Sequence, residues 1–340
     1  MMCNGIGGCD ATFIGSHAGY RNKAVRRNSI TCRSRAVRNF FAPLRVHHRG
    51  NGRVDRRADR NVAPRKAIEI KKNPSVNRDP NTVTSKQSAR LEFRVGNFHN
   101  IGRREEQQDS FCSSDINDKS ALLERGLMAV VADGMGGMEG GAAISHLVTD
   151  TFLNHYADAG NVEPSEFLYN TAHAAEIAVE EYRRRTGVKG GSTVVAILIK
   201  NNVLHFVSIG DSRIYLLRQN DLVQLNHEHT FGAFLRAQAE KGEVDPDEAD
   251  NNPNRDALTA YVGMGSFRTV DRGDPIELKA GDKILLCSDG VFNTLDQNEL
   301  IAALEGDVIT ASARIEEKIL EKAIDIQDNF TGVIVECTDE

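Results

Sequence analysis

Hydrophobic and polar positions follow no regular period over residues 1–90 and follow clear ones from Leu91 onward. The first segment contains basic runs such as Arg53–Arg57 and ends in the polar stretch Asn73–Arg90. Because such a composition cannot easily bury a core, we expect residues 1–90 to be disordered. Three interpretations of residues 1–90 remain open: a basic tether, an Arg-rich organelle-targeting peptide, or sequence read from a misplaced start codon.

After residue 90, short runs rich in β-formers alternate with turn residues, which predicts strands. Leu127–Ala132 shows no alternation, so we expect a strand buried on both faces. Asn201-Asn202 predicts a tight hairpin, and Gln219-Asn220-Asp221 predicts a second one. The predicted strands are Glu92–His99, Leu127–Ala132, Thr193–Lys200, Val203–Ile209, Arg213–Arg218, Leu222–Leu225, Lys283–Ser288 and Gly332–Cys337.

Apolar residues at helical spacing predict helices between these strands. Two helices follow the second strand, a run of hairpins comes next, and further helices precede the last strand. That order favours an α+β fold over a doubly wound parallel sheet. The predicted helices are Gly141–Ala157, Pro164–Arg185, Phe231–Lys241, Gln297–Leu304 and Asp307–Ile326.

Charge divides the chain at the same place as the hydrophobic pattern. Residues 1–90 hold 20 of the 42 Lys and Arg but five of the 48 Asp and Glu, a formal charge of +15 that leaves −21 for residues 91–340. So acidic a part would repel a phosphate backbone, so we do not expect nucleic acid as its partner. We expect no membrane span and no secretory signal, because no apolar stretch approaches about 20 residues. The six cysteines show no metal or disulfide spacing, which favours a reducing, cytoplasmic compartment.

Candidate chemistry lies in aspartates at the ends of hydrophobic runs. Asp133 follows the buried strand and precedes glycines, which let a backbone approach a ligand closely. Asp211, Asp289 and Asp328 hold comparable positions beside other runs. An isolated buried carboxylate is costly, and several that converge repel one another. A hard divalent cation with oxygen ligands relieves that repulsion, so the pattern favours a metal site.

The order of six short motifs resembles the metal-dependent PPM-type (type 2C) protein phosphatases, particularly their bacterial branch. The resemblance covers about residues 91–337, and six motifs in the same order are a specific signal. The motifs are Arg104-Glu105-Glu106-Gln107-Gln108-Asp109-Ser110, Ala132-Asp133-Gly134-Met135-Gly136-Gly137, Gly190-Gly191-Ser192-Thr193, Gly210-Asp211-Ser212-Arg213, Ser288-Asp289-Gly290 and Asp328-Asn329-Phe330-Thr331.

This resemblance implies a phosphatase domain over residues 91–337, with two mostly antiparallel sheets packed face to face between helices as four α-β-β-α layers. It implies Mn²⁺ or Mg²⁺ as cofactor, as two ions with a possible third, that ready a water for attack on phosphoserine or phosphothreonine. Asp133 would bridge the two ions. Their remaining ligands, the ligand of a third ion and the phosphate-binding arginine would be Asp289, Asp328, Asp109, the Gly134 carbonyl, Asp211 and Arg104.

Two positions depart from the family pattern. Gln107-Gln108 stands where the family has Asn-Glu, which removes a carboxylate and could weaken the second ion. Met135 stands where many eukaryotic relatives have a histidine, so no protein group is named as the general acid. By position, residues 226–264 resemble the flap of the bacterial branch, and we expect His227 and His229 within it to be surface residues rather than metal ligands.

Two alternative functions compete with this interpretation. Cys32 and Arg38 have the Cys-x5-Arg spacing of cysteine-dependent phosphatases, but no strand precedes them and no glycine lies between them, which favours chance. A pseudophosphatase that serves as a binding or regulatory module is the second alternative, and the retained aspartates argue against it. We expect a monomeric signalling enzyme that acts on phosphorylated Ser/Thr proteins, with a cognate Ser/Thr kinase as a partner by analogy.

Overall fold

The computed structural model describes residues 2–3, 90–135, 140–265 and 269–339. The chain divides into two compact units, and all described residues belong to the unit formed by Met1–Gly5 and Asn77–Glu340. The prediction of disorder for residues 1–90 therefore falls almost wholly outside the described residues, as do Cys32 and Arg38. Met2–Cys3 is an exception, because these two residues form the short strand β1.

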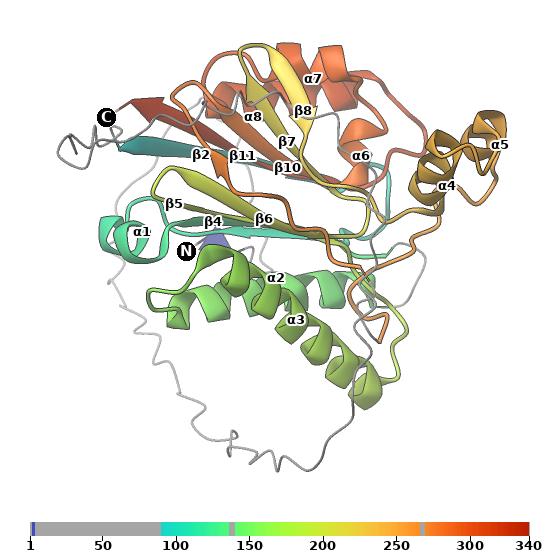
Figure 1. Cartoon of the computed structure of the whole chain (residues 1–340), viewed down its shortest axis with the longest axis horizontal. Coiled ribbons are helices and arrows are strands. Elements are labelled where there is room, and N and C mark those ends of the chain that lie inside the picture. Colours follow the sequence, from blue (N-terminus) through green and yellow to red (C-terminus); the bar gives the residue numbers. More distant parts are fainter. Residues whose placement is uncertain (1, 4–89, 136–139, 266–268, 340) are drawn as a thin grey trace, which may run out of the picture. The chain divides into compact units, whose positions relative to one another are not determined.

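Two antiparallel sheets form the centre of this unit (Figure 1). In spatial order, the six-stranded sheet contains β1, β3 (Asp109–Ser113), β4 (Leu127–Asp133), β5 (Val194–Lys200), β6 (Val203–Ile209) and β9 (Ile276–Glu277). The five-stranded sheet contains β2 (Leu91–Asn100), β11 (Phe330–Asp339), β10 (Lys283–Cys287), β7 (Arg213–Arg218) and β8 (Asp221–Gln224).

Helices cover the outer face of each sheet (Figure 1). α2 (Gly141–Asp158) and α3 (Pro164–Thr186) pack on the six-stranded sheet, and α7 (Gln297–Ala303) and α8 (Val308–Glu321) pack on the other. The shorter helices are α1 (Lys119–Arg125), α4 (Phe231–Glu240), α5 (Pro246–Asn251) and α6 (Asp289–Phe292). The α+β class and the four α-β-β-α layers are thereby confirmed.

Three hydrophobic clusters fill the spaces between the four layers, and alternate side chains of a strand enter different clusters. Along β4, Met128 and Val130 face α2 and α3, whereas Ala129 and Val131 face the opposite sheet. Because both faces of β4 are covered, every position can be apolar. The absence of alternation in Leu127–Ala132 therefore indicated burial on both sides correctly.

The hairpins follow their turn residues. Asn201 and Asn202 have φ values of 52° and 62°, the left-handed pair that a two-residue type I′ loop requires. Gln219 and Asn220 adopt the same conformation, at 53° and 64°. Asp221 pairs with Arg218, so the second loop is two residues long rather than the predicted three.

Several boundaries and short elements differ from the predictions. The helix predicted over Asp307–Ile326 ends at Glu321, and Ala323 with φ 49° lies in the left-handed region just beyond it. Strand β3 was not predicted, because its sequence Asp109-Ser110-Phe111-Cys112-Ser113 is mostly polar. Short helices such as α1, α5 and α6 were missed as well, since they span only one or two turns.

Candidate metal centre

The pairing of β3 with β4 places two aspartates directly opposite each other at one end of the six-stranded sheet. Asp109 opens β3, Asp133 closes β4, and the two are register partners. Directly opposed residues of an antiparallel pair point to the same face. Asp109 is 1% exposed, whereas Asp133 keeps some accessible surface at the mouth of the site.

The second sheet brings two more aspartates to the same place. Asp289 begins α6 directly after β10, and Asp328 lies just before β11, the neighbour of β10. The two segments touch through their backbones, because a Cβ on Gly290 would lie 2.1 Å from the Asn329 carbonyl oxygen. A Cβ on Gly102 would lie 2.1 Å from the Asp328 carbonyl oxygen. Glycine at both positions therefore allows the three segments to converge.

Asp211 joins the group from the turn between β6 and β7. Its neighbour Ser212 is fully buried and exchanges a 2.7 Å hydrogen bond with the Thr193 hydroxyl. The same hydroxyl accepts the backbone N–H of Asp133 at 3.0 Å. Thr193 thereby ties the Asp211 turn to the end of β4.

The pKa values report how closely these carboxyls crowd together. Desolvation raises the pKa of Asp133 well above its usual value, and repulsion from Asp109, Asp289, Asp211 and Asp328 adds to this. Desolvation likewise raises the pKa of Asp109 to about 7, of Asp211 to about 7 and of Asp289 to about 6. Repulsion from neighbouring aspartates contributes at each of the three. All five predicted aspartates are therefore electrostatic neighbours.

Three hydroxyl-bearing residues that the sequence did not single out hold these aspartates in place, and two of them, Ser288 and Thr331, hydrogen-bond the Asp109 carboxylate. Ser288 donates its hydroxyl to Asp109 Oδ2 at 2.7 Å and accepts the Thr331 backbone N–H at 3.0 Å. Thr193 acts on Asp133 as described above. Each lies within a recognised motif, next to an aspartate or a strand end, which is the signal that could have identified it.

Arg104 lies at the rim of the aspartate group. Its Nη2 donates to Asp328 Oδ2 at 2.7 Å, and the two side chains are 48% and 38% exposed. A guanidinium at such a rim offers the planar, bidentate geometry that suits a phosphate. Arg104 also lowers the pKa of Asp289, against the larger raising effects of desolvation and Asp328.

The donor chemistry fits a hard divalent cation. The five carboxylates supply only oxygen ligands, and each ionised carboxylate disfavours ionisation of the others. Within the described residues, no three His, Cys, Asp or Glu side chains already stand in a ligand-shell arrangement. Instead, Asp289 shares a hydrogen bond with Asp133, and Asp328 pairs with Arg104. The carboxylates therefore converge, and a hydrogen bond between two of them and one arginine contact engage some of their oxygens.

The departure at Gln107-Gln108 has a structural counterpart. Gln107 Oε1 accepts the backbone N–H of Asp109 at 3.0 Å, while its buried Nε2 has no hydrogen-bond partner among the described residues. The Gln108 amide donates to Glu106, and its backbone oxygen accepts the N–H of Gly134 at 3.0 Å. Both glutamines thus serve the backbone of Asp109 and Gly134.

The two flap histidines differ from each other. His227 is exposed, as expected, but His229 is 7% exposed, so its prediction as a surface residue was wrong. His229 Nδ1 accepts the Gly210 backbone N–H at 3.0 Å, next to Asp211. Its backbone N–H donates to the Gly210 oxygen at 2.8 Å. This pairing with the β6–β7 turn buries the ring.

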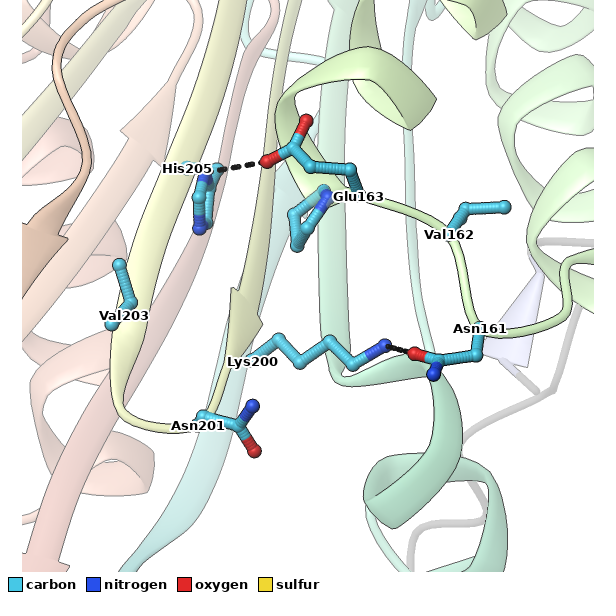
Figure 2. Close-up of a pocket in the computed structure, with 8 residues that line it drawn as sticks. Asn161, Val162, Glu163, Lys200, Asn201, Val203 and His205 are labelled. Carbon is cyan, nitrogen blue, oxygen red and sulfur yellow. Dashed lines mark hydrogen bonds and ion pairs between the residues drawn. The ribbon is translucent and has the colours of Figure 1, made fainter.

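A hollow of about 500 Å³ lies at the other end of β5 and β6, away from the aspartates (Figure 2). His205 Nδ1 exchanges a 2.8 Å hydrogen bond with the Ser165 hydroxyl and lies 4.0 Å from Glu163. Lys200 donates to Asn161 at 2.7 Å. These polar groups are paired within the protein and close the α2–α3 loop against the β5–β6 hairpin.

Known proteins resemble this chain in both sequence and fold. Residues 100–324 match the model of the Protein phosphatase 2C family, so the chain belongs to that family. It is 30% identical over 234 residues to the serine/threonine protein phosphatase PstP of Mycobacterium tuberculosis, an alignment that covers 66% of this chain and 43% of the relative. The chain thus spans less than half the length of that relative.

Further relatives agree in sequence and in structure. The protein phosphatase PhpP of Streptococcus pneumoniae is 28% identical over 211 residues, covering 61% of this chain and 81% of the relative. The crystal structure of M. tuberculosis PstP/Ppp superposes with a TM-score of 0.62 at 27% identity, covering 74% of this chain and 100% of that one. A structure of the PstP catalytic domain in complex with two manganese ions gives a TM-score of 0.61 at 27% identity, covering 73% and 100%.

None of the helices in the described part of the chain combines the length and the apolar character that crossing a bilayer requires. α3, the longest at 23 residues, carries three consecutive arginines in its last turn.

Proposed function

We propose that this chain is a protein serine/threonine phosphatase that hydrolyses phosphoserine and phosphothreonine at a binuclear Mn²⁺ or Mg²⁺ centre. The observation that carries the proposal is the convergence of five aspartates from both sheets at one end of the sandwich. Membership of the Protein phosphatase 2C family supports it.

In this proposal each aspartate has a separate role. Asp133 would hold both ions, with Asp289 and Asp328 at the first site and Asp109 and the Gly134 carbonyl at the second. Asp211 would hold a third, weaker ion. A pair of bound divalent cations supplies an activated water and neutralises charge on the phosphoryl oxygens.

The other residues orient the carboxylates and the substrate. Ser288 and Thr331 hold the Asp109 carboxylate by side-chain hydrogen bonds, which orients it as a ligand. Arg104 exchanges its contact with Asp328 for the substrate phosphate, which it binds with paired N–H donors. Exchange is feasible because both side chains are partly exposed and an exposed ion pair contributes about 0–1 kcal/mol.

The substrates in this proposal are phosphorylated Ser/Thr proteins, with a cognate Ser/Thr kinase as the opposing enzyme. Residues 226–264, which include α4 and α5, would contact the phosphoprotein as a flap. An ion-pair relay joins this segment to the core, since Glu228 contacts Arg213 of β7 at 2.5 Å and Arg236 of α4 at 3.8 Å. The chain is proposed to work as a cytoplasmic monomer.

The deciding experiment measures phosphate release from a phosphothreonine peptide by the full chain across Mn²⁺ concentration, with and without EDTA. We expect saturable Mn²⁺ dependence and complete loss with EDTA. Thermal unfolding in the same series should show stabilisation, of about 2.7 kcal/mol at a hundred times the dissociation constant. Hydrolysis that survives chelation would contradict the metal mechanism, and Mn²⁺ binding without hydrolysis would favour the pseudophosphatase.

A further inference from the structure

Glu176 is a buried acid of α3 that has no part in the proposed chemistry. Its side chain faces the C-terminal end of the predicted flap, and the residue is 5% exposed. Its Oε2 accepts the backbone N–H of Gly263 at 2.5 Å, and its Oε1 accepts that of Gly265 at 2.7 Å. A single carboxylate therefore holds two backbone donors of one short loop.

The loop is shaped to bring both donors to the helix. Gly263 and Gly265 have φ values of +100° and +94°, which side chains other than glycine rarely adopt. A Cβ on Gly263 would also lie 2.9 Å from Val179 Cγ1 of α3. The close approach leaves the Glu176 carboxylate and the two N–H groups to satisfy each other, because a buried polar group without a partner is costly.

Residues 260–265, called the flap stem below, continue directly into the proposed metal centre. Val262 exchanges two backbone hydrogen bonds with Ser192, at 3.1 and 2.8 Å. Ser192 forms a further antiparallel bridge with Gly134, and its hydroxyl donates to the Asp133 carbonyl oxygen at 3.0 Å. A continuous ladder thus runs from the flap stem to the backbone of Asp133 and Gly134.

We propose that Glu176 is a positioning residue that fixes the flap stem on α3 and, through Ser192, sets the backbone of Asp133 and Gly134 for ion binding. The kinetic part of this inference rests on the proposed function. The structural part does not, because the two hydrogen bonds and the ladder are observed independently of any assigned activity. Substitution of Glu176 should therefore loosen the stem and weaken the centre together.

The test compares three variants of the full chain with the wild type. Glu176→Gln is nearly isosteric, but it places an amide donor against one of the two N–H groups. Glu176→Asp keeps the charge on a side chain that is one methylene shorter. Glu180→Gln is the matched control, because Glu180 lies one turn further along α3 and is exposed.

The first readout is hydrogen exchange by mass spectrometry on the metal-free protein. Exchange in peptides that span residues 258–265 should be about tenfold faster in Glu176→Gln, intermediate in Glu176→Asp and unchanged in Glu180→Gln, since each lost bond removes a modest net stabilisation. Unchanged exchange in a folded Glu176→Gln variant would overturn the proposal. If circular dichroism shows that Glu176→Gln does not fold, Glu176→Asp decides by the same criterion.

The second readout is the Mn²⁺ dissociation constant, measured by calorimetry. We expect it to rise about tenfold in Glu176→Gln, with kcat/KM on a phosphothreonine peptide falling in parallel and Glu180→Gln unaffected. Faster exchange with unaltered Mn²⁺ affinity would overturn the link from the stem to the centre. A wild-type protein that binds Mn²⁺ but hydrolyses no phosphopeptide would refute the proposed function. The inference about Glu176 would then be decided by the hydrogen-exchange rates and the Mn²⁺ dissociation constants alone.

Discussion

Strands β5 and β6 have polar clusters at both ends, and the two clusters are built on opposite principles. At the hairpin end, Lys200 donates to Asn161, and His205 Nδ1 lies within reach of both Ser165 and Glu163, so each charge or donor meets a complement. Figure 2 shows the Lys200–Asn161 and His205–Glu163 contacts. At the other end, burial and then mutual repulsion raise the pKa values of the aspartates, opposed by hydroxyl and backbone hydrogen-bond donors and by Arg104 and Arg213. The polar groups of the hairpin cluster pair with one another, whereas the aspartate cluster would be stabilised by a bound cation.

Asp133→Asn should produce the largest effect, because Asp133 belongs to the aspartate cluster. It removes the charge that would hold two ions, so kcat/KM on a phosphothreonine peptide should fall by about three orders of magnitude or more. The metal-free variant should unfold at the same or a higher temperature, because an amide relieves repulsion among the aspartates. The assay is Mn²⁺-dependent hydrolysis beside thermal unfolding in EDTA, and near-normal turnover would refute the ligand assignment.

The next largest effect should be the change with pH in the free energy of unfolding of the metal-free protein. The folded-state pKa values of Asp109 and Asp211 are raised to about 7, above the usual value near 3.8. A raised carboxyl pKa gives stability that is fully present below about pH 4 and is lost as the pH rises through about 7. Denaturant unfolding in EDTA should show this loss, of roughly 3 kcal/mol between pH 4 and pH 8 after the acid-labile contributions of other groups are subtracted.

Two comparisons isolate the aspartates in that profile. Asp211→Asn should remove part of the loss, and saturating Mn²⁺ should reverse it, because bound cations favour the ionised carboxylates. A metal-free Asp211→Asn profile that matches the wild type would show that Asp211 does not contribute.

Arg104→Ala should weaken catalysis by a smaller amount. Loss of a bidentate, charge-assisted contact to the substrate phosphate should lower kcat/KM by about 10- to 100-fold. Stability should change little, because the Arg104–Asp328 pair is exposed. Arg103→Ala is the matched control and should retain activity, and an equal loss in both variants would remove the assignment of Arg104.

His205→Gln should have the smallest effect, because it lies in the hairpin cluster. Burial lowers the pKa of His205, against a raising contribution from Glu163. A lowered histidine pKa gives stability that is present above about pH 6.5 and is lost as the pH falls, the opposite direction to the aspartates. The variant should retain kcat/KM. In denaturant unfolding it should lose the fall in stability toward low pH, and its free energy of unfolding at pH 8 should change by about 1 kcal/mol or less. A marked fall in activity would connect the two clusters.

The sequence predicted the long elements because each of them buries a distinct face. Leu127–Ala132 and the Ala-rich face of α3 are examples in which hydrophobic spacing decides the structure alone. β3 could not be predicted this way, because its first two residues are polar, with Asp109 buried among the aspartates and Ser110 buried against Thr149 of α2. The five aspartates were found from their strand-end positions and the order of motifs.

The contacts around those aspartates were beyond the reach of sequence patterns. Ser288 and Thr193 act through hydrogen bonds to residues far away along the chain. Glu176 reads as one more polar residue on an amphipathic helix, and His229 reads as a surface residue in a polar segment. Their burial depends on how the flap stem and the β6–β7 turn pack, which no local period encodes.

The pairing of β2 with β11 has a consequence for how this protein is made. β11 contains the last described residues of the chain, yet it lies between β2 and β10 and pairs with β2 from Phe330↔Asn100 to Asp339↔Leu91. Asp328 and β11 therefore leave the ribosome only after the other described elements of this unit. A chain truncated before Asp328 should consequently lack one of the five aspartates and the strand that joins β2 to β10, and it should release no phosphate from the phosphothreonine peptide.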